Sequence, residues 1–146
     1  MEKKEKELLN RMYQDATVGM LAIDKILKKT KDDALKKTFQ KQYDMYDKFA
    51  DKCDALAMNN DFDIKENGFF KKFKQSAMLY MSLWIDGTAR HIVEMMITGT
   101  VMGIIDTIKA EQDLKTKNIE LNEMVVEFKK IQEDFYEKLK KQLAKV

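Results

Sequence analysis

The sequence predicts an all-α protein, and three observations support that prediction. The 146 residues include no proline and only five glycines, so few positions interrupt a helix. Apolar residues recur at alternating spacings of three and four along most of the chain, which is the pattern of one buried helix face. No alternating run bounded by turn residues indicates a β-strand. A chain of this length is expected to form a single domain, residues 1–146, with a buried core.

The first two helices are predicted over residues 3–29 and 31–58. The seam of the first consists of Leu9, Met12, Ala16, Gly19, Ile23 and Ile26. The seam of the second consists of Leu35, Phe39, Gln42, Tyr46, Phe49, Cys53 and Leu56. Thr30, followed three residues later by an acid, is the predicted N-cap of the second helix. So short a link favours an antiparallel pair.

Three features of the second helix have structural interpretations. Gln42 is the one strongly polar residue on the seam, and a buried amide needs a hydrogen-bond partner that fixes the register of packing. A second row, displaced by two residues, is expected to face solvent; it consists of Asp44, Asp47, Asp51 and Asp54. Cys53 lies on the seam and is interpreted as a small core residue rather than as a nucleophile.

Residues 59–67 are predicted to form a loop, and residues 67–85 a third helical segment. The first half of that segment is basic and aromatic, with Phe69, Phe70 and Phe73 beside three lysines. The second half is apolar and leads to Trp84, which we expect to be buried. The Asp86–Gly87 pair predicts a break before the next helix.

The central helix is predicted over residues 86–112, and a final helix over residues 118–145. Between Ile92 and Ile108 the apolar residues fall on every side, as in a helix that is buried on several faces or that spans a membrane. The longest uncharged run, residues 95–105, has 11 residues, whereas a span needs about 20. The pattern therefore favours the core helix of a soluble protein.

The connection between the second and central helices is long enough to return the chain along the whole bundle. Some 27 residues separate them, where a simple up-down bundle needs a handful. Two helical hairpins joined by a long crossover have ferritin-like connectivity. We expect the crossover helix to pack lengthwise over the central helix, which would explain why residues 92–108 are apolar on all sides.

The segment HIVEMMITGTVMGI, residues 91–104, resembles small bacterial proteins of the ferritin-like superfamily. The resemblance implies a four-helix bundle with a long crossover helix between the second and third bundle helices. Members of that superfamily bind two metal ions through glutamates and two Glu-x-x-His pairs. This chain has a single histidine, and His91 and Glu94 have that spacing in reverse order. The resemblance therefore implies the fold, and the chemistry does not carry over.

The candidate site residues each have a structural and a functional interpretation. Glu94 is expected to pair with His91 or Arg90 in a polar strip where helices meet. The alternative is a degenerate iron or manganese site of redox or storage function, for which the candidate ligands are His91, Glu94, Asp15 and Glu127. We expect no metal or other cofactor.

A second candidate region combines small and flexible apolar residues. Gly99 and Gly103 allow a neighbouring helix to approach closely, or leave a hollow for a ligand. Five of the eleven methionines lie between residues 78 and 102, and methionine fills irregular gaps or forms adaptable binding surfaces. Phe69, Phe70 and Phe73 cannot all face one groove, so we expect exposed aromatic surface and a homodimer.

The function predicted from these patterns is binding or self-association without catalysis. The net charge of +2 and the absence of a long basic block argue against nucleic acid. Docking of the basic, aromatic segment on an acidic membrane surface is the weaker hypothesis. The first ten residues lack the apolar region of a signal peptide, and the single cysteine excludes an internal disulfide, so we expect a cytoplasmic protein. The partner is predicted to be a protein or a small apolar ligand.

Overall fold

The computed structural model describes residues 1–66, 68–82 and 87–146, with all their side chains except those of residues 66, 68–70, 73, 80 and 82. This part of the chain is helical and contains no strand, which confirms the all-α prediction. The elements are α1 (Lys3–Leu27), α2 (Asp33–Asn59), a short 3-10 helix η1 (Ile64–Glu66), α3 (Gly68–Ser82), α4 (Ala89–Asp113) and α5 (Ile119–Leu143).

Polar caps set where α2 and α4 begin. Asp32 accepts the Leu35 N–H at 2.9 Å, so α2 begins at Asp33, and the prediction of Thr30 as its N-cap was wrong. The hydroxyl of Thr30 instead donates to the Ile26 carbonyl at 2.8 Å and completes the end of α1. Thr88 caps α4 through the His91 N–H at 3.3 Å, consistent with the break predicted near Gly87.

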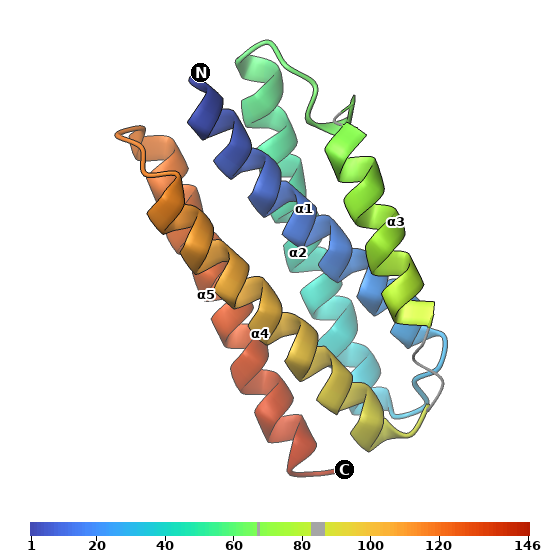
Figure 1. The fold of residues 1–146 in the computed structure, drawn as a ribbon. Helices are drawn as coiled ribbons and strands as arrows, with labels where there is room; N and C mark the ends of the chain where they lie inside the picture. Colours follow the sequence, from blue (N-terminus) through green and yellow to red (C-terminus); the bar gives the residue numbers. More distant parts are fainter. Residues whose placement is uncertain (67, 83–86) are drawn as a thin grey trace.

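Two antiparallel hairpins, α1–α2 and α4–α5, lie side by side (Figure 1). The helix α3, which connects the two hairpins in the chain, runs back along the bundle (Figure 1). Because α3 returns the chain to the end where α2 began, α2 and α4 run in the same direction (Figure 1). The hairpins contact each other mainly through α1 with α4 and α2 with α5.

The core is built from the predicted seams of α1 and α2 and from the buried face of α5. Phe49 and Phe128 stack with ring centroids 4.5 Å apart, and Phe39 packs edge-on against Phe135 at 6.4 Å. Gln42 is buried on the seam as expected, at 2% exposure. Burial raises the pKa of the Cys53 thiol, as suits a core residue and not a nucleophile.

The position of α3 differs from the expected one. It packs against α1 rather than lengthwise over α4, and the outer face of α4 is open, with Met102 and Ile105 exposed by 60% and 47%. In the described part of the chain, α4 is the one helix that is long and apolar enough to cross a membrane, and only 28% of its apolar window is buried. We expected α4 to be apolar on all sides because all of its sides are buried, and that explanation was wrong.

Candidate functional site

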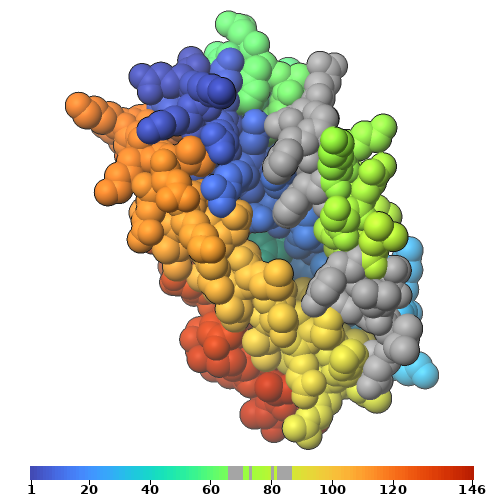
Figure 2. Space-filling model, viewed as in Figure 1, coloured from blue at the N-terminus to red at the C-terminus, as the bar shows by residue number. Residues whose placement is uncertain are grey.

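A cavity of about 590 Å³ lies between α1, α3 and α4, and side chains from α2 and α5 also line it. This face of the molecule is hollowed between the three helices (Figure 2). Its volume falls in the range of small-molecule sites, about 300–1,000 Å³. The cavity lies where α3 was expected to pack on α4.

The walls of the cavity are mostly apolar. Four methionines line it, namely Met81 of α3 and Met95, Met96 and Met102 of α4. Gly99 lies among them, and a Cβ atom built there would meet nothing within 4 Å. Tight helix packing therefore does not explain Gly99, and the alternative of a hollow next to this glycine is the one that fits.

Two other glycines allow larger side chains to reach the inner side of the cavity. A Cβ on Gly19 would lie 2.6 Å from Cε2 of Tyr46, so only glycine lets this ring pack against α1. A Cβ on Gly103 would lie 3.1 Å from Nε2 of Gln132, which is close but tolerable. Tyr46 and Gln132 are both buried and both line the cavity.

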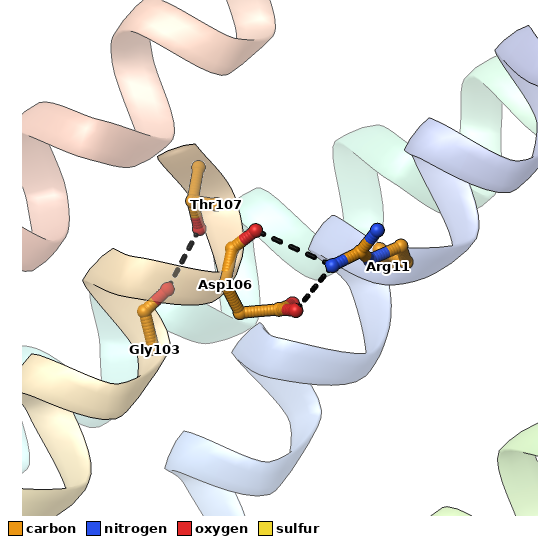
Figure 3. A network of polar contacts seen from close by, with 4 residues as sticks. All are labelled: Arg11, Gly103, Asp106 and Thr107. Carbon is orange, nitrogen blue, oxygen red and sulfur yellow. Dashed lines mark hydrogen bonds and ion pairs between the residues drawn. The ribbon is translucent and has the colours of Figure 1, made fainter. Parts of the chain in front are cut away.

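The polar groups of the cavity wall include Asp106 of α4, which forms an ion pair with Arg11 of α1 next to the cavity. The Arg11 guanidinium donates to the carboxylate of Asp106 and, at 3.5 Å, to the backbone carbonyl of the same residue (Figure 3). The hydroxyl of the next residue, Thr107, donates to the carbonyl of Gly103, one turn earlier on α4, at 3.0 Å (Figure 3). Arg11 and Asp106 are 25% and 36% exposed, so the pair is partly screened by solvent.

Asp15, one turn after Arg11 on α1, adds a second carboxyl group beside Asp106. Its Oδ2 atom has almost no contact with solvent and no donor partner among the described residues. Burial, and then the hydrogen bond with Asp106, raise the pKa of Asp15 well above its usual range. Two carboxylates cannot donate to each other, so this contact is a hydrogen bond only when one of them holds a proton.

The opposite directions of the two pKa shifts favour Asp15 as the residue that holds the proton. Although burial acts to raise the pKa of Asp106, the hydrogen bonds from Asp15 and Arg11 outweigh it and lower that pKa. The cavity wall thus contains a neutral acid, Asp15, beside a carboxylate, Asp106, whose charge the guanidinium of Arg11 compensates. We call Asp15 and Asp106 the acid pair.

Comparison with protein-family models, with curated proteins and with solved structures finds no match. The arrangement of side chains in the described part of the chain is therefore the basis for assigning a function.

The four candidate metal ligands are not brought together. Glu94 is exposed and pairs with Arg90 at 3.2 Å, one of the two partners expected for it. Glu127 pairs with Lys52 at 2.7 Å. The acid pair lies fifteen residues further along α4 than His91, about 20 Å at helical rise. Within the described residues, no three His, Cys, Asp or Glu side chains could share a metal ion.

The prediction from sequence named some cavity residues and missed others. It named Gly99, Gly103 and Asp15, but it did not single out Arg11, Asp106 or Gln132 as site residues. Asp106 carried a usable signal, because it is an acid within the most apolar helix of the chain. The side chains of Phe69, Phe70 and Phe73, and all of Trp84, lie outside the described residues, so their predicted roles stay predictions.

Proposed function

We propose that this protein is a non-catalytic helical bundle of ferritin-like connectivity that binds a small, largely apolar molecule in the cavity between α1, α3 and α4. The observation that carries the proposal is the cavity itself, about 590 Å³ with four methionines in its walls. A preformed apolar hollow with a few polar groups is the usual form of a ligand site. The two hairpins and the return of the chain through α3 support the connectivity.

The methionines favour a ligand whose shape is not closely specified. Thioether side chains are flexible and polarisable, so they repack around different apolar bodies at little cost. Gly99 leaves its side of the cavity free of side-chain atoms. The site therefore suits a class of molecules with a common apolar character.

The test is binding of a neutral, environment-sensitive dye, N-phenyl-1-naphthylamine, whose fluorescence rises in apolar surroundings. We expect saturable binding of one dye per chain. Gly99→Phe adds a ring where a Cβ meets nothing within 4 Å, so it should fill part of the cavity and weaken dye binding at least tenfold.

Thr98→Phe is the matched control, because Thr98 is the exposed neighbour of Gly99 and does not line the cavity. It should bind the dye like the wild type. Circular dichroism would establish that both variants are equally helical. Equal dye binding by Gly99→Phe and the wild type would refute the assignment of the ligand to this cavity.

Self-association is a second candidate function, favoured by the open face of α4. Met102, Ile105 and Ile108 are all exposed there, and such apolar residues are often covered by a partner. The measured mass in solution separates this function from ligand binding by a monomer. A third candidate function is metal binding at a degenerate iron or manganese site, which analysis of the metal content of the purified protein tests.

A further inference from the structure

We propose that the ligand of this cavity is a lipophilic organic cation, that is, one positive charge on an apolar body, bound with its charge against Asp15 and Asp106. This inference rests on the proposed function and adds the chemical class of the ligand. Its supports are the placement of both carboxyl groups in the cavity wall and the buried Oδ2 atom of Asp15, which has no hydrogen-bond donor among the described residues.

Among the described residues Asp15 takes part in no ion pair, whereas Asp106 is paired with Arg11. Asp15 and Asp106 together carry two negative charges when ionised, and the guanidinium of Arg11 compensates for one. In the empty cavity a proton on Asp15 provides the second positive charge, because an uncompensated carboxylate in an apolar site is costly. A bound cation can take the place of that proton.

None of the other charged groups near the acid pair forms an ion pair with Asp15 among the described residues. Glu7 of α1 acts on Arg11, and Lys109 of α4 lines the cavity but is exposed and acts on Asp106. Tyr46 of α2 is neutral at physiological pH, because burial raises its pKa to about 12. The described lining residues of α3 and α5 include no titratable side chain.

The remainder of the cavity suits the apolar body of such a ligand. The methionine side chains offer polarisable surface to it, and the buried residue Tyr46 adds an aromatic side chain to the lining. A neutral apolar molecule would use the same walls, but it would leave the acid pair with its proton.

The exchange of a proton for a cation predicts that binding depends on pH. While Asp15 holds its proton, each cation that binds releases it to solvent, so affinity for the cation should rise up to tenfold per pH unit. The rise should end once Asp15 is ionised in the empty protein. A neutral ligand releases no proton, so its affinity should not change in this way.

The experiment compares decyltrimethylammonium with 1-decanol, both below any micelle-forming concentration, as competitors of the dye from pH 5 to pH 8. A quaternary ammonium keeps its charge throughout, so any change reports the protein. Calorimetry in two buffers of different ionisation enthalpy counts the protons released. We expect close to one proton per bound cation at the acid end of the range and none for decanol.

Asp15→Asn should weaken cation binding at least tenfold above the pH at which Asp15 ionises, and should abolish its dependence on pH. Decanol binding should persist and shows that the variant is folded. Asp51→Asn, an exposed aspartate of α2 outside the cavity, is the control for the lost charge and should behave like the wild type.

The outcomes separate the two proposals. Binding of decanol without binding of the cation, or equal cation binding by Asp15→Asn and the wild type, would overturn the cation assignment and leave the cavity function standing. Binding of neither competitor, together with no dye binding, would overturn the proposed function itself.

Discussion

Replacing Asp15 with Asn tests whether the acid pair holds a proton in the folded protein. The pKa of Asp15 is raised by folding, from an ordinary value near 3.8, so the folded chain binds more protons than the unfolded chain between the two values. The contribution of Asp15 to stability is then greatest below its unfolded pKa and declines as pH rises toward its folded pKa.

Each pH unit of that window changes the free energy of unfolding by at most about 1.4 kcal/mol, or about 5 °C in Tm for a domain of this size. Asparagine has the shape of the protonated acid, can donate to Asp106 and does not titrate. The advantage of Asp15→Asn over the wild type should therefore grow with pH across the window, and the variant should be the more stable protein at pH 7.

The assay is urea unfolding followed by circular dichroism at intervals between pH 4 and pH 7.5. The difference between the two free energies of unfolding isolates Asp15, because the other groups are common to both chains. Asp51→Asn again controls for the loss of one carboxyl group. Parallel stability curves for Asp15→Asn and the wild type, or a less stable Asn variant at pH 7, would refute the shared proton.

Three further predictions concern packing, assembly and metal content. Gly19→Ala should destabilise the protein by about 1 kcal/mol or more in urea unfolding, since its Cβ would overlap the Tyr46 ring, whereas Gly99→Ala should stabilise it by up to about 1 kcal/mol; the reverse order would contradict the packing described for α1. Light scattering should report a homodimer, and a mass near 17 kDa at high protein concentration would count against it. Elemental analysis should find no stoichiometric pair of iron or manganese ions, and two ions per chain that disappear in His91→Ala would favour the metal hypothesis instead.

The helices were predictable because their sequence pattern reports burial directly. The unbroken seam from Leu35 to Leu56 placed the second helix at residues 31–58, and the structure has it at Asp33–Asn59. The start of α2 differs from the prediction because Thr30 and Asp32 are both good N-cap residues. The hydroxyl of Thr30 bonds to α1, which leaves Asp32 to cap α2.

The relative placement of α3 and α4 was not predictable in the same way. Composition shows that residues 92–108 are apolar, but it does not show which helix packs on each side. The sequence prediction assigned the crossover helix to that face, whereas α3 packs on α1 and a cavity separates it from much of α4.

The acid pair illustrates a second limit. Arg11 and Asp106 are 95 residues apart in sequence, and nothing in the spacing of either helix says that they meet. Asp15 was visible as an acid flanking the seam of α1, but its protonation depends on the carboxyl group that α4 brings beside it. A site formed by residues of two hairpins can be identified only once the packing of one hairpin on the other is known.

The two five-residue links, residues 28–32 and 114–118, have a consequence for the order of folding. Contacts inside each hairpin close short loops and should form early, whereas contacts between the hairpins close the long loop that contains α3 and should form late. Asp15 and Asp106 would then meet only in the late step. We therefore expect the protonation of Asp15 to affect the joining of the two hairpins and not the formation of either one. Alkaline pH should accordingly speed the separation of one hairpin from the other while each hairpin keeps its own helices.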